Sequence, residues 1–226
     1  MNVPHLLVVA KAPVPGRVKT RLGAEVGMEV AAQLATASLA DTVAACTATY
    51  GAERCLLALD GTLDGAVGEP HLRELLEGWQ LFPQRGDGLA ERLVNAHADA
   101  ADRTGGAVVQ VGMDTPQLTP ELLSTVADGL STSDTVLGPA DDGGWWVLAA
   151  RDPRAVAAIA EVPMSTPTTG MATRRALEAA GLSVALAATL RDVDTVEDAD
   201  AVAALIPGSR FGAAWQPVRR LLERGD

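Results

Sequence analysis

The chain has 226 residues, a length typical of one domain, and 48% of them are hydrophobic, which is enough for a large core. Its formal charge of −11 argues against nucleic acid or an anionic membrane as a partner, because both need a broad basic surface. No apolar run reaches the roughly 18 residues of a membrane-spanning helix, and no secretion signal is recognisable. Cys46 and Cys55 fit reduced thiols, so we expect a cytoplasmic protein.

Short apolar runs alternate with longer helical patterns along the first half of the chain. Continuous β-branched or leucine-rich runs favour buried strands, and apolar residues spaced three or four apart favour helices. The expected strands are 6–10, 55–60, 80–84 and 107–112. The expected helices are 26–48, 71–78, 88–103 and 119–130, the last with Thr119 as its N-cap and Pro120 at its first helical position.

The same alternation continues to residue 206. Strands are expected at 134–139, 144–150 and 183–190, and helices at 152–160, 168–180 and 195–206. A Pro-Gly-Ser break follows at 207–209, and Pro217 is expected to disrupt any long helix after it. We therefore predict a single domain, residues 1–206, followed by a C-terminal tail segment, residues 207–226.

Alternating strands and helices predict a three-layer α/β/α fold with a mostly parallel central sheet. Ligands of such sheets bind in the loops beyond the carboxyl ends of the strands. The loops to inspect are therefore 11–21, 84–88, 112–119, 138–145 and 190–195.

The loop after the first expected strand reads "KAPVPGRVKTRL", and the first 21 residues of this acidic chain contain no acidic residue. Pro15 belongs to a stiff approach to Gly16, where the backbone can come close to a ligand. The basic side chains can neutralise a polyanion such as the phosphates of a nucleotide; they are Lys11, Arg17, Lys19 and Arg21. The alternative is a solvated basic turn that balances an acidic surface.

Three aspartates follow expected strands. Asp114 lies two residues past the strand 107–112, and Asp192 and Asp194 share one face of the extended segment after 183–190. Carboxylates so placed can hold Mg²⁺ together with substrate phosphates. The alternatives are a turn capped by Asp114 and a helix-capping box formed by Asp194 with Glu197.

Two glycine-rich turns are further candidates. In "GPADDGGWWVLA", Asp142, Gly143, Gly144 and Trp145 can border a ligand, with one tryptophan facing the site and its neighbour in the core; the alternative is an ordinary tight hairpin. In "QRGDGLAERL", the candidates for contacting a base or ribose are Gln84, Gly86 and Gly88, although an ordinary strand-to-helix turn explains them equally well.

In chain order, the motifs "AKAPVPGRVKTRL", "GDGLAERL", "VGMDTPQLT", "GPADDGGWWVLA", "VPMSTP" and "RDVDTVEDAD" resemble a bacterial family over residues 5–205. It comprises nucleotide-diphospho-sugar transferases of the GT-A fold, often described as arsenosugar-biosynthesis or radical-SAM/selenodomain-associated glycosyltransferases. More distantly, the chain is similar to the guanylyltransferases of molybdenum-cofactor and deazaflavin-cofactor assembly. Residues 1–206 would then be one nucleotide-binding transferase domain.

The resemblance also implies roles for individual residues. Lys19 and Arg21 would hold nucleotide phosphates, with Arg17 as a mobile outer contact. Asp114 would hold Mg²⁺ or Mn²⁺ with Asp192 or Asp194, and the acceptor pocket would be bordered by Gly143, Gly144 and Trp145. Two departures from the family pattern are Trp145, where tyrosine is common, and Met113, where a small hydroxyl residue is frequent.

The leading prediction is nucleotidyl transfer from a nucleoside triphosphate to a phosphate-like group on a small acceptor, with Lys19, Arg21 and Asp114 as catalytic residues. One alternative is glycosyl transfer from a nucleotide-sugar. Against it, the basic loop carries more charge than a diphosphate donor needs, and the central strand ends in one aspartate rather than Asp-x-Asp. A second alternative is a nucleotide-binding domain without catalysis. The sequence allows a monomer or a homodimer.

Overall fold

The computed structural model of the protein describes residues 3–225. Its strands form one sheet in the order β3-β2-β1-β4-β6-β5-β7. Strand β6 runs antiparallel to β4 and β5, and the other pairings are parallel, so the predicted mostly parallel sheet is confirmed. The strands are β1 (His5–Lys11), β2 (Cys55–Asp60), β3 (Gln80–Pro83), β4 (Val108–Gly112), β5 (Thr135–Pro139), β6 (Trp145–Ala150) and β7 (Val184–Leu186).

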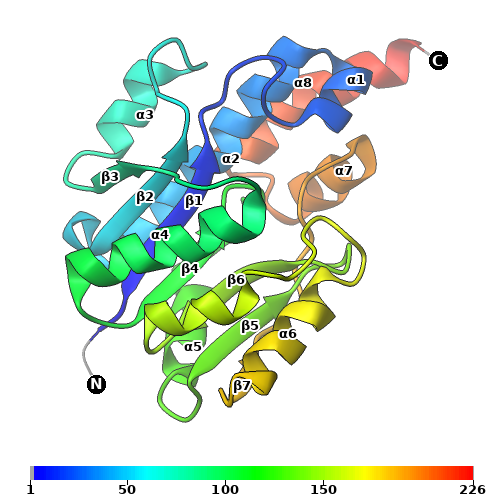
Figure 1. Cartoon of the computed structure of the whole chain (residues 1–226). Helices are drawn as coiled ribbons and strands as arrows, with labels where there is room; N and C mark the ends of the chain where they lie inside the picture. Colours follow the sequence, from blue (N-terminus) through cyan, green and yellow to red (C-terminus); the bar gives the residue numbers. More distant parts are fainter. Residues whose placement is uncertain (1–2, 226) are drawn as a thin grey trace.

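Helices cover both faces of this sheet, which confirms the three-layer architecture (Figure 1). One face packs against α2, α3 and α5, and the other packs against α4, α6 and the 3-10 segment η2. The helices are α1 (Thr20–Val26), α2 (Met28–Tyr50), α3 (Glu69–Leu75), α4 (Leu89–Thr104), α5 (Pro120–Gly129), α6 (Thr169–Ala179), α7 (Val196–Leu205) and α8 (Arg210–Gly225), with the 3-10 segments η1 (Ala52–Arg54) and η2 (Pro153–Ile159).

The central strands are apolar on both sides because both faces of the sheet are covered. In β1, Leu6 and Val8 pack into the core beneath α2, while Leu7 packs into the core beneath α4. The sheet order reverses between β1 and β4, and the two strands end side by side, with Val9 paired to Gly112. This reversal opens the crevice in which α/β proteins bind ligands.

Two expected elements differ in extent from those observed. The expected helix 26–48 begins earlier, as the short helix α1, and is interrupted at Gly27, whose φ of 91° lies in the region that favours glycine. The expected strand 183–190 is reduced to the three residues of β7. The remainder leaves the sheet edge and rejoins it only through a bridge from Leu190 to Ala140, which brings the following loop to the carboxyl ends of the strands.

The C-terminal segment corrects the expectation about Pro217. Residues 210–225 form one helix, α8, with Pro217 inside it. Its N-terminus is held by the Asp41 carboxylate of α2, which accepts hydrogen bonds from the backbone N–H groups of Arg210 and Phe211. Trp215 is 1% exposed and packs between α2 and α7, so tertiary contacts outweigh the helix-breaking effect of proline. The division at residue 207 stays a prediction, and residues 1, 2 and 226 lie outside the described residues.

Both cysteines are free and buried. Burial raises the pKa of Cys55 to about 12 and also raises that of Cys46, so both thiols are protonated and unreactive near neutral pH. Within residues 3–225, no helix combines the length and the apolar character needed to cross a membrane.

His97 is a buried titratable group on α4, beneath the sheet. Neither ring nitrogen has a hydrogen-bond partner among the described residues. Burial lowers the pKa of His97 to about 4, and the nearby Gln110 side chain offsets this effect only in part. The ring is therefore neutral in the folded protein at neutral pH.

We expect His97 to make the protein less stable in mild acid. The unfolded chain takes up the proton near pH 6.5, so the free energy of unfolding falls as the pH drops below 6.5 and levels off below about 4. At 1.36 kcal/mol per pKa unit over roughly 2.5 units, the loss is about 3 kcal/mol. The free energy of unfolding can be measured by urea denaturation at several pH values. Between pH 4 and 6.5 it should depend on pH less steeply in His97→Leu than in the wild type, by the equivalent of one proton. The exposed His71→Gln is the control, and an unchanged slope in His97→Leu would contradict the expectation.

Candidate active site

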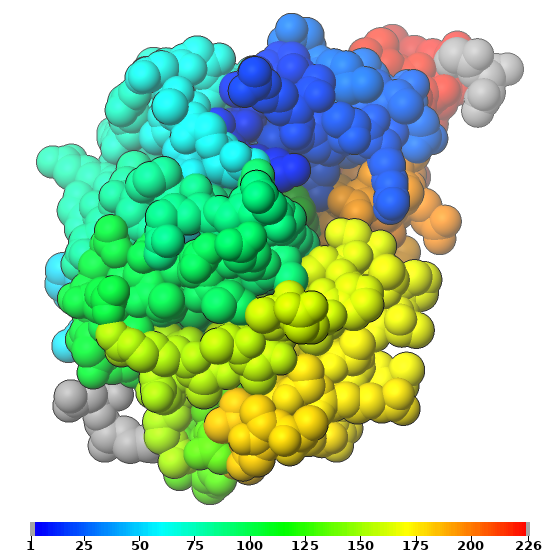
Figure 2. Space-filling model, viewed as in Figure 1, coloured from blue at the N-terminus to red at the C-terminus, as the bar shows by residue number. Residues whose placement is uncertain are grey.

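The loops at the carboxyl ends of the strands enclose a cavity of about 860 Å³, within the size range of small-molecule sites. Figure 2 shows the surface hollowed where the blue, green, yellow and orange segments meet. Most of the residues predicted from the sequence line this cavity. They are Lys11, Arg17, Lys19, Arg21, Gln84, Gly88, Asp114, Asp142, Gly144, Trp145, Asp192 and Asp194.

The basic loop is held in place by its apolar residues. Val18 is buried in the main core and Leu22, in α1, is buried against α7 and α8. Between them, Lys19 takes a left-handed conformation, with φ 48° and ψ 42°, at the N-cap of α1. Such a conformation is uncommon for a side chain with a Cβ atom and occurs where the surroundings enforce it. It turns the Lys19 side chain inward, while the basic side chains of Arg17 and Arg21 stay exposed.

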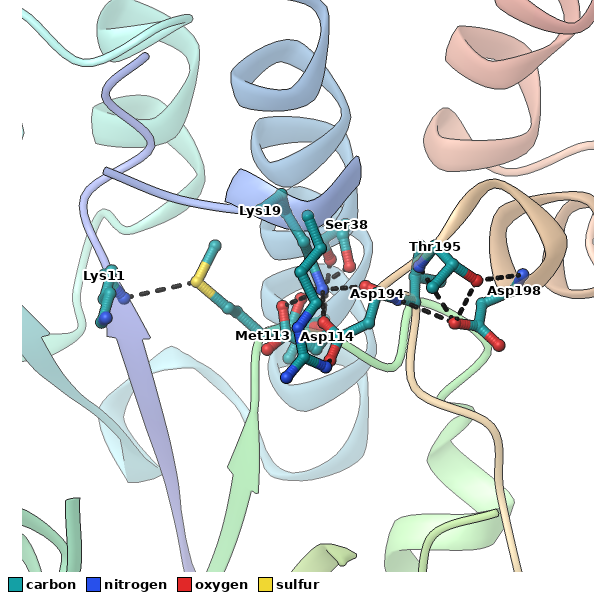
Figure 3. Close-up of polar contacts among 11 residues, drawn as sticks. Lys11, Lys19, Ser38, Met113, Asp114, Asp194, Thr195 and Asp198 are labelled. Atoms are coloured by element: carbon teal, nitrogen blue, oxygen red, sulfur yellow. Dashed lines mark hydrogen bonds and ion pairs between the residues drawn. The ribbon is translucent and has the colours of Figure 1, made fainter. Parts of the chain in front are cut away.

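Lys19 reaches two of the predicted aspartates from α1 (Figure 3). Its Nζ lies 2.6 Å from Asp114 Oδ1 and 3.3 Å from Asp194 Oδ1, and it also donates to the carbonyl oxygen of Val193. The Lys19 side chain is only 5% exposed. Burial alone would lower its pKa, but the charges of the two aspartates outweigh burial and raise the pKa of Lys19, so the ammonium stays charged. The structure therefore buries Lys19, which the sequence placed on an exposed loop.

The loops carrying Asp114 and Asp194 are also joined through their backbones. The Val193 N–H donates to the carbonyl oxygen of Asp114 at 2.9 Å. The carbonyl of Met113, beside Asp114, accepts a hydrogen bond of 2.6 Å from the Ser38 hydroxyl of α2. The carboxylate of Asp114 meets Lys19, and among the described residues it accepts no backbone N–H of its own turn, so the turn-capping alternative is not what the structure shows.

Helix α7 is capped one residue later than the sequence alternative supposed. Thr195, not Asp194, is the N-cap, and it forms a capping box with Asp198 rather than Glu197. Asp194 is thereby released from helix capping and its carboxylate turns to Lys19 and Arg21. The alternative role of Asp194 as a cap is therefore wrong.

Asp192 is the third predicted carboxylate in the cavity. Its Oδ1 is buried and has no hydrogen-bond partner among the described residues. Burial, reinforced by the negative charge of Asp114, raises the pKa of Asp192 to about 7. A buried carboxylate oxygen without a donor is costly unless something positive approaches it.

The donor set fits a metal ion shared with a ligand better than a complete protein cage. Among residues 3–225, no three acidic, histidine or cysteine side chains are arranged to hold a metal ion. Asp114 and the unpartnered Asp192 nevertheless line one cavity and are close enough for their charges to interact. Mg²⁺ commonly binds one or two carboxylates and completes its coordination with water and phosphate oxygens. In this structure the Lys19 ammonium lies between Asp114 and Asp194, so the three predicted aspartates do not face one open metal position.

The remaining positive charge of the basic loop is exposed around the cavity. Lys11 and Arg17 are exposed, and the Arg21 side chain is 78% exposed and lies 3.9 Å from Asp194. Sequence reasoning missed Arg92 of α4, which also lines the cavity and binds the Asp60 carboxylate at 2.7 Å. The position of Arg92 in "GDGLAERL" could have indicated this role. A helix that follows a glycine-rich turn at the site has its first residues close to the site.

Several residues that were predicted to contact the nucleotide have a structural role instead. The Gln84 amide nitrogen donates to the carbonyl oxygens of Ala10 and Ala58, so this side chain ties the ends of β1 and β2 together at the cavity wall. Pro15, Gly16 and Gly86 are not among the cavity-lining residues. Gly16 instead allows the turn before Arg17, with φ 77°.

The turn between β5 and β6 both forms a hairpin and lines the cavity. The Asp142 carboxylate accepts a hydrogen bond from the Gly144 N–H at 2.8 Å. Gly143 is not part of the cavity lining and packs against the segment before α6, where a Cβ atom would lie 2.0 Å from the Pro167 carbonyl oxygen. Its requirement for glycine therefore comes from close packing rather than from ligand approach.

We expect Gly143→Ala to destabilise the protein by about 1–3 kcal/mol more than Gly16→Ala, because of the clash with Pro167. Both glycines have positive φ, 87° and 77°, but nothing lies within 4 Å of a Cβ atom at Gly16. The control therefore shares the backbone strain and lacks the clash. Thermal unfolding measures both, and equal losses would show that the packing of Gly143 is unimportant.

The tryptophan pair divides in burial, although both residues line the cavity. Trp145 is half-buried and donates from its indole nitrogen to Thr173, while Trp146 is 2% exposed and packs in the main core. On the same side as Trp145, the cavity is lined by Met164, Ser165, Thr166, Pro167 and Thr169. Sequence reasoning used this "VPMSTP" segment only as one of the family motifs and assigned no role to its residues.

This fold is shared with solved structures of nucleotide-diphospho-sugar transferase type. The chain matches, over residues 42–166, the family described as "Uncharacterized protein conserved in bacteria (DUF2064)". The protein belongs to this family. The more specific resemblance to arsenosugar-biosynthesis or radical-SAM-associated transferases stays a prediction. No curated protein matches the sequence.

Solved structures share the fold over nearly the whole chain. A Desulfovibrio desulfuricans G20 protein with the provisional name nucleotide-diphospho-sugar transferase is 25% identical, with a TM-score of 0.86 over 99% of this chain and 98% of that one. A cytidylyltransferase from Leptospira borgpetersenii is 13% identical, with a TM-score of 0.58 over 98% and 95%. A Mycobacterium tuberculosis H37Rv protein solved with manganese is 19% identical, with a TM-score of 0.50 over 89% and 98%.

Proposed function

We propose that this protein is a Mg²⁺-dependent nucleotidyltransferase that moves a nucleotidyl group from a nucleoside triphosphate to a phosphate-like oxygen of a small acceptor. The observation that carries the proposal is the charge arrangement of the cavity. Four carboxylates line it, those of Asp114, Asp142, Asp192 and Asp194, together with the exposed cations Lys11, Arg17 and Arg21. The transferase names of the structural neighbours support the enzymatic character.

The proposed reaction needs positioning and charge neutralisation rather than a covalent enzyme intermediate. An oxygen of the acceptor phosphate, already ionised at neutral pH, attacks the α-phosphorus, and the bond to the β-phosphate oxygen breaks to release pyrophosphate. The exposed arginines Arg17 and Arg21 hold the phosphates in forked contacts. Trp145 and the segment 164–169 border the acceptor. Mg²⁺ held by Asp114 together with Asp192 or Asp194 would neutralise charge on the departing pyrophosphate.

Glycosyl transfer from a nucleotide-sugar is the second candidate. The neighbour that is 25% identical over nearly its full length carries the name of that class, which favours it. The exposed face of Trp145, beside the hydroxyls of Ser165 and Thr166, could also receive a sugar ring. Against it stands a cavity with three exposed cations, which suits a triphosphate better than a diphosphate.

A thermal-shift panel separates these candidates. Each nucleoside triphosphate and a set of nucleotide-sugars are tested with and without Mg²⁺, because a ligand at about 100 times its dissociation constant adds about 2.7 kcal/mol of stability. Mg²⁺-dependent stabilisation by one triphosphate, followed by pyrophosphate release with a phosphorylated acceptor, supports nucleotidyl transfer. Stabilisation by nucleotide-sugars alone replaces it with glycosyl transfer, and no stabilisation by any of them overturns both.

A further inference from the structure

The contacts of Lys19 leave its ammonium group with no free donor. An ammonium carries three N–H groups, and here they meet three oxygens, those of Asp114, Asp194 and the Val193 carbonyl. The side chain is 5% exposed, whereas neighbouring Arg21 is 78% exposed. Lys19 as observed therefore cannot also hold a nucleotide phosphate, which is the role that the family resemblance implied.

The oxygens around Lys19 are those that a hard divalent cation selects. Two carboxylates and a backbone carbonyl are typical ligands of Mg²⁺ and Mn²⁺. The unpartnered Oδ1 of Asp192 lies in the same cavity and feels the charges of both Lys19 and Asp114. In this structure the Lys19 ammonium group already supplies a positive charge between these carboxylates.

We propose that Lys19 is a positioning residue whose ammonium group occupies the cation position between Asp114 and Asp194, and that a divalent metal ion displaces it when it binds with the nucleotide. This inference rests on the proposed function, because it concerns the metal that the nucleotide brings. In the absence of nucleotide, Lys19 keeps the two aspartate loops together and neutralises part of their charge. Once displaced, its ammonium is free to meet the phosphates.

The exchange couples metal binding to nucleotide binding. A metal ion arriving alone must expel a buried, charged ammonium from its three oxygen partners, so it binds weakly. Nucleotide phosphates offer that ammonium a new counter-charge, so metal and nucleotide bind together more tightly than either binds alone. Linkage requires the metal to strengthen nucleotide binding by the same factor.

Mn²⁺ binding to the nucleotide-free protein tests the exchange without any turnover. Free Mn²⁺ is counted by electron paramagnetic resonance for the wild type and for Lys19→Gln, a neutral side chain that can still donate to Val193. We expect Lys19→Gln to bind Mn²⁺ at least about tenfold more tightly, because a competing unit charge is gone. Lys11→Gln is the matched control, since it removes the same charge from an exposed lysine of the same cavity that pairs with no carboxylate among the described residues; we expect a change below about threefold.

Two results of this titration overturn the proposal. Equal Mn²⁺ affinity in Lys19→Gln and the wild type means that Lys19 does not compete with the metal. An equal gain in Lys19→Gln and Lys11→Gln means that only the net charge matters. Adding Asp114→Asn to Lys19→Gln should abolish the gain, and retention of the gain would place the metal elsewhere.

A measurement on the wild type keeps the proposal testable should Lys19→Gln fail to fold. Lys11 and Lys19 are the only lysines of the chain. Nuclear magnetic resonance of protein labelled with ¹⁵N-lysine therefore follows Lys19 directly, with exposed Lys11 as the internal reference. We expect the Lys19 Nζ signal to shift in step with binding of Mg²⁺ and nucleoside triphosphate. An unchanged signal at full binding overturns the exchange.

The experiments can disprove the proposed function and the proposed exchange at Lys19 independently of each other. If no nucleotide binds while Lys19→Gln gains Mn²⁺ affinity, the transferase proposal falls and only the competition between Lys19 and a metal ion stands. If nucleotide and Mg²⁺ bind and turn over while the Lys19 signal stays unchanged, the function stands and the exchange falls.

Discussion

Asp114→Asn is expected to abolish the Mg²⁺-dependent part of nucleotide binding and to lower transfer activity by about 10²–10³-fold. Asp114 lies at the end of the central strand β4, in the cavity, and its carboxylate already attracts the ammonium of Lys19 at 2.6 Å. Asparagine keeps the shape and one oxygen but loses the negative charge that a divalent cation requires. The loss should therefore appear only when Mg²⁺ is present.

Thermal unfolding with and without Mg²⁺-nucleotide measures this effect directly. Wild-type protein should gain about 2.7 kcal/mol at a ligand concentration of 100 dissociation constants, and Asp114→Asn should gain only what the nucleotide provides without metal. Asp64→Asn is the matched control, because it removes the same charge from an exposed residue paired with Arg73. An Asp114→Asn variant that keeps the full Mg²⁺-dependent shift would show that Asp114 is not a metal ligand.

Trp215→Ala is expected to lower the free energy of unfolding by about 3–5 kcal/mol, a loss typical of a large buried aromatic residue. Trp215 is 1% exposed between α2, α7 and α8, and its indole nitrogen donates to the Asp200 carboxylate at 2.7 Å. Truncation leaves a cavity in this second cluster and an acceptor without its donor. Because α1 packs against the same cluster through Leu22, the basic loop should also lose its support.

Urea denaturation of Trp215→Ala decides whether the C-terminal helix contributes to the stability of the whole domain. Leu221→Ala is the control on the same helix, since Leu221 is 68% exposed and surface changes usually stay within about 0.5 kcal/mol. A single transition shifted to lower urea would indicate one cooperative unit. Similar, small losses in both variants would mean that α8 is an appendage, as the division at residue 207 supposes.

The sequence could predict the sheet and the places where the site would form. Apolar runs such as 6–10 and 107–112 indicate strands buried on both faces, and alternation with helices indicates parallel order. Parallel strands then bring their carboxyl ends to one edge, so Asp114 and the basic loop could be placed in one site from local patterns alone. The capping of the helix 119–130 by Thr119 is equally local and is confirmed.

Other features were out of reach because they depend on distant contacts. The N-cap of α7 lies one residue later than the sequence alternative. The segment Asp-Thr-Val-Glu-Asp allows two overlapping capping boxes, Asp194 with Glu197 or Thr195 with Asp198. The structure has the second, in which Asp194 is free to contact Lys19. Pro217 is tolerated inside α8 because Trp215 and Phe211 are buried. The requirement for glycine at position 143 follows from Pro167, 24 residues later in the chain.

By itself, the sequence determined the α/β alternation, the sheet class and the identity of the charged loops, because hydrophobic periodicity and strand-end placement are local properties of the chain. Only the tertiary structure decided which charges meet. It buried Lys19 among Asp114, Asp194 and the Val193 carbonyl, and left Arg17 and Arg21 exposed. These basic residues look alike in "GRVKTR", but the left-handed backbone at Lys19 and the anchoring of Val18 and Leu22 in two different cores send their side chains in different directions.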